Sequence, residues 1–461
     1  MSGERSLVPE WVRSEVVALR SATGQSATYG QLRERAAALP LPSPGLVLVK
    51  TTNSVDVIST YVACFLAGVP IALIDQSVTD DVVASLVETY QPIAVVNHSA
   101  VLHGYSVSLE SGGTMWQHRE GPAAPTHPDL AVMLATSGST GSPKFVKLSR
   151  SAVVSNARSI AEGLGVRDEH RAITSLPFSY SYGLSVINSH LAVGASTAVT
   201  DAAVVTKDFW NLVRNERVST IAGVPTTYKM LRQMRWDASD LPHLEYVTQA
   251  GGRLPDPDRL HFLDTLARVG KDFVVMYGQT EATARITIAP TELLREHLST
   301  AGRAIPGGQL TISSEAGSRE GAVTYHGPNV MMGYASTAED LVTGDELGGI
   351  LETGDLGYLV GEALFLTGRS KRIVKVFGVR VSLDDVDGWL QQRGAAVAVQ
   401  GDDSIEVFVE SHDLEAPELR RSLADYLGIH LTGVRVTTVE KLPLLSSGKV
   451  DFITLQGWVG R

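Results

Sequence analysis

The chain has 461 residues, of which 44% are hydrophobic and 19% charged, a composition typical of a globular protein with several domains. The formal net charge of -11, from 39 Lys and Arg against 50 Asp and Glu, argues against broad binding to nucleic acids or anionic membranes. The single cysteine, Cys64, excludes an internal disulfide, and its apolar neighbours predict a buried, unreactive thiol.

The hydrophobic pattern gives no sign of a membrane segment. The longest apolar run, residues 62–74, contains Gly68 and Pro70 and is shorter than the roughly 20 residues that span a bilayer. The N-terminus is charged and has no apolar segment of signal-peptide length. A cytoplasmic location is therefore expected.

The first part of the chain alternates helical patterns with short apolar runs. Thr28-Tyr29-Gly30-Gln31 has the pattern of a capping box at a helix start, and Gly68 is typical of a helix end. Alternation of this kind predicts parallel β-α-β units with right-handed crossovers. Helices are expected at residues 31–38, 55–67 and 80–90, and strands at residues 46–50, 71–74, 93–96 and 130–134.

The alternation continues and then changes in character. Strands at residues 172–175, 197–199, 220–222, 246–249 and 273–276 predict a second α/β layer of similar size. From Leu310 onward, short strands broken by glycine, at residues 309–312 and 322–325, predict a small antiparallel β unit. Beyond Arg369, a segment short enough to be a lid domain is predicted, with helices at residues 383–391 and 415–426 and strands at 395–399 and 405–409.

A loop rich in hydroxyls and glycines follows the strand predicted at residues 130–134. Its composition is that of a phosphate cradle, because glycines let the backbone approach an anion and hydroxyls and a lysine bind its oxygens. It is not a Walker loop, since Pro143 stands where glycine is required and Phe145 where the magnesium-binding hydroxyl is expected. It is either a nucleotide-phosphate loop of another kind or a polar surface loop. Its candidate binding residues are Thr136, Ser137, Gly138, Ser139, Thr140, Gly141 and Lys144.

Four later stretches are similar in character to this loop. Taken singly, each has an ordinary explanation: a carboxylate at a helix start, a turn cap, an exposed basic face or a surface lysine. The stretches are Tyr277-Gly278-Gln279-Thr280-Glu281, Thr353-Gly354-Asp355, Gly368-Arg369-Ser370-Lys371-Arg372 and Ser447-Gly448-Lys449.

In this order, the five stretches resemble the adenylate-forming superfamily, which includes acyl-CoA synthetases, aryl-acid ligases, adenylation domains of peptide synthetases and firefly luciferase. The resemblance runs from about Thr28 to near the C-terminus. It implies an α/β fold with a large N-terminal domain, residues 1–369, of two α/β layers plus a small β-barrel-like unit. Residues 370–461 would form a small mobile α+β C-terminal lid domain.

The resemblance also implies roles for the five stretches in binding ATP and Mg²⁺. Residues 136–144 would hold the β- and γ-phosphates, with Thr140 also near the metal. In the second stretch, which includes Gly278 and Gln279, Tyr277 would stack on adenine, Thr280 would meet the α-phosphate and Glu281 would bind magnesium.

Other residues would complete the nucleotide and acyl pockets. Gly251 and Gly252 lie where the family lines these pockets, Asp355 would bind the ribose hydroxyls and Arg369 would support it. Lys449 would reach the site from the small domain. Such chemistry needs cations, because a carboxylate must attack the α-phosphorus although both partners are negative.

In the family the small domain rotates between two half-reactions. Lys371 falls at the hinge, so rotation would withdraw Lys449 and bring residues 376–380 towards the site. Tyr180, Tyr182 and Gly183 lie in the region of the acyl pocket, where many family members have histidine at the position of Tyr180. No aspartate stands there to pair with an ammonium, which disfavours an α-amino acid. The chain is also short for the family, which disfavours a large lipid tail.

The sequence therefore predicts a Mg²⁺- and ATP-dependent ligase that activates a small-molecule carboxylic acid and transfers it to coenzyme A. The alternatives are transfer to the phosphopantetheine of a carrier protein or to a nitrogen nucleophile, and a degenerate member that binds nucleotide or acyl ligand without turnover. No carrier segment follows Lys449, so an external thiol is expected. Either a monomer or a homodimer is compatible with this prediction.

Overall fold

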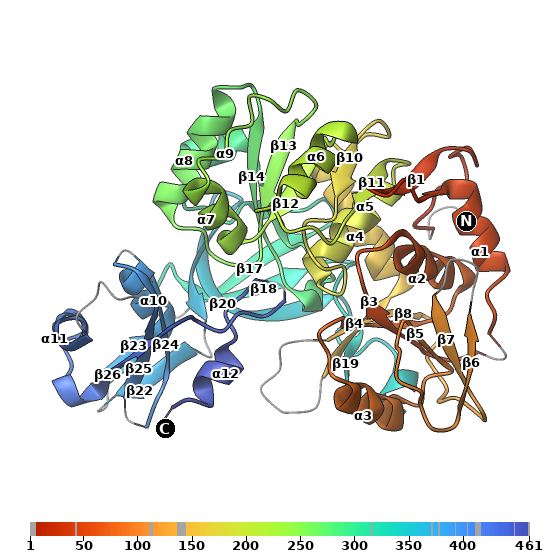
Figure 1. Cartoon of the computed structure of the whole chain (residues 1–461). Coiled ribbons are helices and arrows are strands. Elements are labelled where there is room, and N and C mark those ends of the chain that lie inside the picture. Colours follow the sequence, from red (N-terminus) through yellow and green to blue (C-terminus); the bar gives the residue numbers. More distant parts are fainter. Residues whose placement is uncertain are drawn as a thin grey trace.

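The computed structural model describes residues 6–41, 44–109, 114–135, 144–314, 317–369, 372–376, 379–391, 393–402, 404–410, 416–446 and 448–459. The chain forms two large sheets, a small antiparallel sheet and a C-terminal unit, residues 372–459 (Figure 1). Among these residues, no helix has both the length and the apolar character needed to cross a bilayer.

The first large sheet has eight strands in the order β19-β9-β8-β4-β3-β5-β7-β6. Its central strands are parallel, as the alternating pattern predicts, but both edges are antiparallel. The strands are β3 (Val47–Thr51), β4 (Ile71–Asp75), β5 (Ala94–Val96), β6 (Tyr105–Leu109), β7 (Met115–Arg119), β8 (Leu130–Ala135), β9 (Phe145–Ser149) and β19 (Gly333–Ala335).

The second large sheet has nine strands in the order β16-β15-β14-β13-β12-β10-β11-β1-β2. The strand β1, near the N-terminus, pairs in parallel with β11, a long-range pairing that local patterns do not encode. The strands are β1 (Val17–Ser21), β2 (Ser26–Thr28), β10 (Arg171–Ile173), β11 (Ser196–Val199), β12 (Thr220–Gly223), β13 (Tyr246–Gln249), β14 (Asp272–Tyr277), β15 (Thr287–Ala289) and β16 (Arg303–Ala304).

Helices α2, α4 and α5 pack between the two large sheets and join them into one core (Figure 1). The Tyr61 hydroxyl in α2 donates a 3.0 Å hydrogen bond to Asn188 Oδ1 in α5, and Cys64 is fully buried beside them, as predicted. The Thr28–Gln31 capping box and the left-handed Gly68 after α2 are also confirmed. The helices of this part are α1 (Tyr29–Ala37), α2 (Val55–Ala67), α3 (Asp80–Tyr90), α4 (Arg150–Leu164), α5 (Ser181–Leu191), α6 (Lys207–Asn215), α7 (Pro225–Gln233), α8 (Asp256–Ala267) and α9 (Thr291–Glu296).

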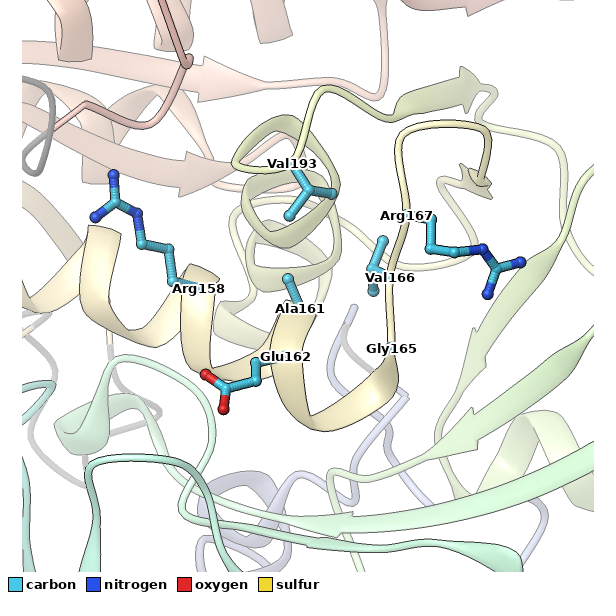
Figure 2. A pocket seen from close by; sticks show the side chains of 7 residues that line it. All are labelled: Arg158, Ala161, Glu162, Gly165, Val166, Arg167 and Val193. Carbon is cyan, nitrogen blue, oxygen red and sulfur yellow. The ribbon is translucent and has the colours of Figure 1, made fainter. Parts of the chain in front are cut away.

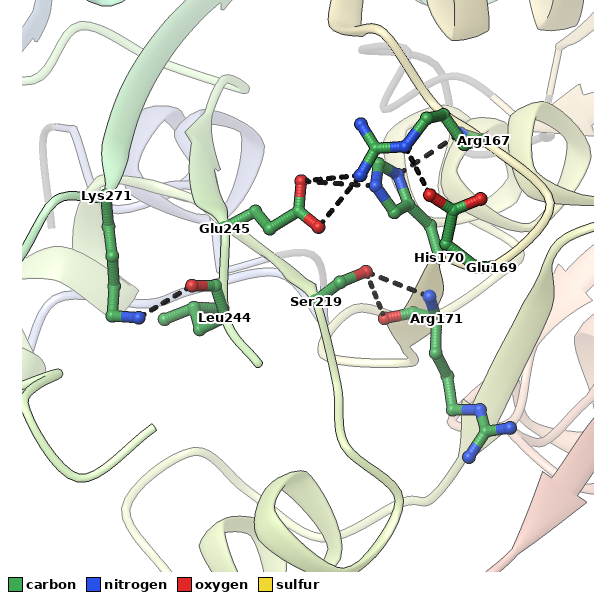
Figure 3. A network of polar contacts seen from close by, with 8 residues as sticks. All are labelled: Arg167, Glu169, His170, Arg171, Ser219, Leu244, Glu245 and Lys271. Atoms are coloured by element: carbon green, nitrogen blue, oxygen red, sulfur yellow. Dashed lines mark hydrogen bonds and ion pairs between the residues drawn. The ribbon is translucent and has the colours of Figure 1, made fainter. Parts of the chain in front are cut away.

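A polar network joins the amino ends of the second sheet's strands (Figure 3). Glu245, just before β13, accepts from Arg167 Nη2 at 3.0 Å and lies 3.2 Å from His170 Nε2. Ser219 and Lys271 satisfy backbone carbonyls of neighbouring strands in the same region. These contacts fix the edge of the sheet opposite to the one where α/β proteins bind ligands.

The small β unit is a four-stranded antiparallel sheet in the order β17-β18-β20-β21, which confirms the predicted change of character after Leu310. In the C-terminal unit, a three-stranded sheet packs against α10 and α11. The strands are β17 (Gln309–Ser314), β18 (Gly321–His326), β20 (Ile350–Val360), β21 (Ala363–Arg369), β22 (Ile373–Val376), β23 (Val379–Ser382), β24 (Ala395–Gln400), β25 (Ile405–Glu410) and β26 (Val434–Val439). The helices are α10 (Leu383–Gln391), α11 (Ala416–Leu427) and α12 (Phe452–Gln456), and short 3-10 turns lie at Thr280–Ala282, Glu339–Val342 and Leu431–Gly433.

Candidate active site

The candidate site lies at the carboxyl ends of β12, β13 and β14, where open α/β sheets bind ligands. The chain leaves these three strands at Val224, Ala250 and Gly278. Tyr180, at the start of α5, and the loop that carries Lys449 meet them there. Five stretches far apart in sequence therefore converge on one edge.

Tyr277 and Asp355, from two of the predicted stretches, contact each other directly. The Tyr277 hydroxyl donates to Asp355 Oδ2, and Arg369 Nε donates to Asp355 Oδ1 at 2.9 Å. Asp355 and Arg369 are cross-strand partners in β20 and β21. Burial raises the pKa of the Asp355 carboxyl from its ordinary value, whereas the Arg369 guanidinium lowers it. Both carboxylate oxygens are thus held in place from opposite sides.

The turn after β14 depends on Gly278. A Cβ on this residue would lie 1.9 Å from the Ala284 carbonyl oxygen, so only glycine fits between β14 and the returning chain. Gln279 Nε2 then donates to the Thr353 carbonyl at 3.3 Å. The Thr280 and Ser181 hydroxyls lie 3.2 Å apart, which links this turn to the start of α5.

Glu281 is held by a tyrosine that sequence patterns do not single out. The Tyr334 hydroxyl, in β19, donates to Glu281 Oε1 at 3.0 Å, and Lys144 Nζ lies 3.6 Å from the centroid of the Tyr334 ring. The pairing of β19 with β9, which begins one residue after Lys144, creates this arrangement. Lys144 and Glu281, predicted to act on phosphate and metal, are therefore connected through one aromatic side chain.

Two tyrosines at the start of α5 form an edge-to-face pair with ring centroids 6.3 Å apart. Tyr182 is fully buried and its hydroxyl donates to the Thr248 carbonyl at 2.8 Å. The Tyr180 hydroxyl faces the bare backbone of Gly251, where a Cβ would lie 2.6 Å away. Gly183 serves the packing of α5, because a Cβ there would meet the Pro177 carbonyl oxygen at 2.2 Å. Gly252 follows Gly251, and a Cβ there would meet the Pro225 ring at 3.2 Å.

Lys449 comes from the C-terminal unit and lies over Tyr180, with Nζ 4.9 Å from the ring centroid. Its loop is docked against the start of α7, where Thr226 Oγ1 donates to the Gly448 carbonyl at 3.3 Å. Gly448 has a φ of 78° and would place a Cβ 2.9 Å from Thr226 Oγ1, so this close approach favours glycine. The docked loop brings the cation to the carboxyl edge of the second sheet.

The environment of Lys449 is partly buried and contains charges of both signs. Its pKa is lowered to about 8, first by burial and then by the charges of Arg369 and Arg285, against the Glu281 carboxylate, which raises it. Burial raises the pKa of Tyr180 to about 12, so its hydroxyl stays protonated in alkaline solution as well.

Two groups of predicted residues lie outside the described part of the chain. The loop residues Thr136, Ser137, Gly138, Ser139, Thr140 and Gly141 form the first, and Lys371 forms the second. The strands β8 and β9 on either side of the loop pair antiparallel, so the loop does not lead into a helix as a Walker loop does.

Three residues that pattern analysis did not identify also shape the site. Arg285 is buried over the Tyr182 ring, with Cζ 4.0 Å from its centroid. Asn329 donates to the carbonyls of Ala282 and Arg285 and so fixes the turn after Glu281. Tyr334 orients Glu281, as described above. Of these, only Asn329 has a sequence signal, a Gly-Pro-Asn turn after a strand.

No protein-only metal site occurs in the described residues, where no group of three or more His, Cys, Asp or Glu side chains could hold an ion. A single carboxylate such as that of Glu281 suits Mg²⁺, which can take one protein carboxylate and complete its coordination with phosphate oxygens and water. A separate hollow of about 480 Å³ lies over α4, between Arg158, Glu162 and Val193, and includes none of the predicted site residues (Figure 2).

The chain is similar in sequence or in fold to several known proteins. The chain is 24% identical to a feruloyl-CoA synthase from Amycolatopsis over 93% of both chains. It is 27% identical to the hybrid PKS-NRPS synthetase TAS1 of Gloeophyllum trabeum, matching 95% of this chain but only 30% of that protein's length. The structure of ATP-bound MatB from Rhodopseudomonas palustris superposes with a TM-score of 0.79 at 20% identity, covering 99% of this chain and 98% of that one. The AMP-binding enzyme family model matches residues 11–335, and the chain therefore belongs to this family of adenylate-forming enzymes.

Proposed function

We propose that this protein uses ATP and Mg²⁺ to convert a small carboxylic acid into its acyl-adenylate and then transfers the acyl group to the thiol of coenzyme A. The observation that carries the proposal is the position of Lys449. It approaches Tyr180 from the C-terminal unit, at the edge where Thr280, Glu281 and Asp355 also lie.

In the first half-reaction, a carboxylate oxygen of the acid forms a bond to the α-phosphorus of ATP, and the bond from that phosphorus to the bridging oxygen breaks. Pyrophosphate leaves with the bonding electron pair. Lys449 supplies positive charge where the two anions meet, and such fixed charges in a water-poor site are often the largest single contribution to catalysis. Thr280 would donate its hydroxyl to the same phosphate.

The nucleotide would be positioned by Tyr277, Asp355 and Arg369. The Asp355 carboxylate, already oriented by two donors, is suited to accept hydrogen bonds from ribose hydroxyls. Glu281 and the loop from Thr136 to Lys144 would hold Mg²⁺ and the leaving pyrophosphate, and the metal would neutralise charge that develops on the phosphates.

In the second half-reaction, the thiol sulfur forms a bond to the acyl carbonyl carbon and loses its proton to solvent. The bond from that carbon to the phosphate oxygen breaks, and AMP leaves with the electron pair. The Lys449 loop lies against Tyr180 and Thr226 in this arrangement, and we infer that the thiol enters after the C-terminal unit has moved. We propose that the predicted lid domain, residues 370–461, which includes this unit, rotates about Lys371 and withdraws Lys449. The likeness to a feruloyl-CoA synthase over nearly the full length of both chains supports coenzyme A as the acceptor.

The test is exchange of labelled pyrophosphate into ATP with a panel of small aliphatic, aryl and amino acids. Acids that support exchange are then incubated with ATP and either coenzyme A, a phosphopantetheine-bearing carrier protein or hydroxylamine, and the products are identified by mass. Exchange together with an acyl-CoA product is the expected result.

Each other result corresponds to a different function. If exchange occurs and only the carrier protein is then acylated, the acceptor is the carrier protein and not coenzyme A. Reaction with the nitrogen nucleophile alone would make the protein an amide-forming ligase. Folded protein that binds ATP but exchanges pyrophosphate with no acid would contradict the proposal and favour a binding protein without turnover.

A further inference from the structure

Arg285 carries a buried positive charge with no acidic partner in the described part of the chain. Its side chain is 2% exposed, and none of the ion pairs between described residues includes it. Its polar contacts are Nε to the Met276 sulfur at 3.2 Å and Nη1 to the Ala284 carbonyl at 3.5 Å. A thioether is a weak acceptor and 3.5 Å is the limit for a hydrogen bond, so the guanidinium is poorly satisfied.

A second buried arginine of the same domain is satisfied by the fold itself. Arg259 is 6% exposed, and it donates to the carbonyls of Leu254, Leu298 and Thr300 at 2.9 to 3.0 Å. These three carbonyls give the Arg259 guanidinium the hydrogen-bond acceptors that a buried structural arginine needs. Arg285 lacks such partners, and a buried charge without them is costly unless a ligand supplies the opposite charge.

The backbone holds Arg285 in a fixed place. Its carbonyl accepts hydrogen bonds from Asn156 Nδ2 at 3.1 Å and Asn329 Nδ2 at 3.0 Å, and both asparagines are buried. Gly278 permits the tight turn that brings the Arg285 backbone against β14. The side chain then lies over the Tyr182 ring. The position of the guanidinium is therefore set by the same turn that carries Thr280 and Glu281.

Arg285 and Lys449 lie on two rings that touch each other. Lys449 is over Tyr180, which is partly exposed, and Arg285 is over Tyr182, which is fully buried. The positive charge of Arg285 also contributes to the lowered pKa of Lys449. One cation is thus at the reacting end of the proposed site and the other lies deeper, beyond the first tyrosine. The same arrangement repels the ammonium of an α-amino acid.

We propose that the acid activated by this protein carries a second carboxylate, and that Arg285 binds it while Lys449 acts at the carboxylate that reacts. The inference rests on the proposed adenylation and adds its substrate class. The guanidinium matches a carboxylate in a two-point hydrogen bond, which a methyl or amide group cannot reproduce. Lys449 and Arg285 lie over two rings that contact each other, so the two cations are close together. A diacid that reaches both of them therefore has a short chain between its two carboxylates.

The experiment compares acids that differ only at the far end. Pyrophosphate exchange is measured with malonate, succinate, glutarate and adipate, and with the corresponding monoamides and methyl-terminated acids. At least one diacid is expected to exceed its amide and methyl counterparts about 100-fold or more in kcat/KM, because a site built for a polar group rejects analogues that lack it.

The role of Arg285 is tested with Arg285→Met, Arg285→Lys and, as a control, Arg268→Met at an exposed position after α8. Arg285→Met is expected to raise KM for the preferred diacid. The ratio of kcat/KM for that diacid to kcat/KM for the methyl-terminated acid should fall below about 10. Arg285→Lys should restore part of the preference, because it keeps the charge but not the planar fork. Arg268→Met should behave as wild type.

Three results would overturn the inference while leaving adenylation intact. These are equal use of diacids and neutral acids by the wild type, a preference for neutral acids, or a diacid preference that Arg285→Met retains. If Arg285→Met does not fold, the inference is still tested by the comparison of diacids with neutral acids in the wild type and by the substrate preference of Arg285→Lys.

If no acid supports exchange, the proposed function fails separately. The inference is then tested by calorimetric titration of the wild type with the same diacids in the presence of AMP, which measures diacid binding without turnover. Binding that Arg285→Met abolishes would support it, and absence of diacid binding would overturn it.

Discussion

The ammonium of Lys449 lies 4.9 Å from the ring centroid of Tyr180, although one residue belongs to the C-terminal unit and the other to the start of α5. The contact depends on a loop whose Gly448 carbonyl accepts a hydrogen bond from Thr226. A cation above an aromatic face is attracted by the negative face of the ring. Tyr180, which stands where many family members have histidine, therefore supports the lysine without titrating.

Replacing Lys449 by alanine is expected to lower the rate of pyrophosphate exchange by about 10²- to 10³-fold, the usual cost of removing one charge that stabilises a transition state. Transfer from a supplied acyl-adenylate to coenzyme A should stay within about threefold of wild type, because the lysine is withdrawn in that step. Both rates are measured on the same protein. Lys441→Ala, at an exposed position shortly before the same loop, is the control. Equal loss in both steps would contradict the proposed rotation.

The pH dependence follows from the pKa of Lys449, which is lowered to about 8. The ammonium is the active form, so its charge is present below this value and is lost as pH rises through it. We expect kcat/KM for exchange to fall about tenfold for each pH unit above about 8, since this parameter reports the free enzyme. Lys449→Arg should remove this alkaline limb because arginine stays protonated. If kcat/KM of Lys449→Arg falls above about pH 8 as in the wild type, the titrating group is a residue other than Lys449.

Glu281→Gln is expected to raise the Mg²⁺ concentration needed for half-maximal exchange by about 10- to 100-fold, because it removes the carboxylate that we propose as the ligand of the metal. Tyr334→Phe should cause a smaller rise, about threefold, since it removes one hydrogen bond that orients Glu281. The measurement is exchange against free Mg²⁺ at saturating ATP. Glu292→Gln, exposed on α9, is the control. A magnesium requirement that Glu281→Gln leaves unchanged would place the metal elsewhere.

Gly278→Ala is expected to lower the stability of the N-terminal part by about 2–4 kcal/mol, because the new Cβ would lie 1.9 Å from a backbone carbonyl that cannot move freely. Gly252→Ala is the matched control. Its Cβ meets only Pro225 Cγ at 3.2 Å, so a change of less than about 1 kcal/mol is expected. Denaturant unfolding followed by tryptophan fluorescence measures both. Similar stabilities for the two variants would show that the turn after β14 relaxes more easily than the structure indicates.

Local patterns were sufficient for most elements. The predicted helices at residues 55–67, 80–90 and 383–391 and the strand at residues 246–249 coincide with α2, α3, α10 and β13. These segments have a clear period and a residue that stops them, such as Gly68, so the signal is contained in the segment itself. The pairing of β1 with β11 and of β19 with β9 was not predicted, because partners that distant are chosen by the packing of the whole core.

The sequence by itself determined the family and the order of its five stretches, since each of them is contiguous and rich in residues with few structural alternatives. It also predicted that Lys449 and Glu281 act at one site. Only the tertiary structure decided which other side chains join them. Arg285 looks like an ordinary polar loop residue in the sequence. Its burial without a counter-charge arises from the turn at Gly278 and from contacts with residues far away in the chain. Burial and charge pairing are properties of the assembled core, and they suggest a substrate with a second negative charge.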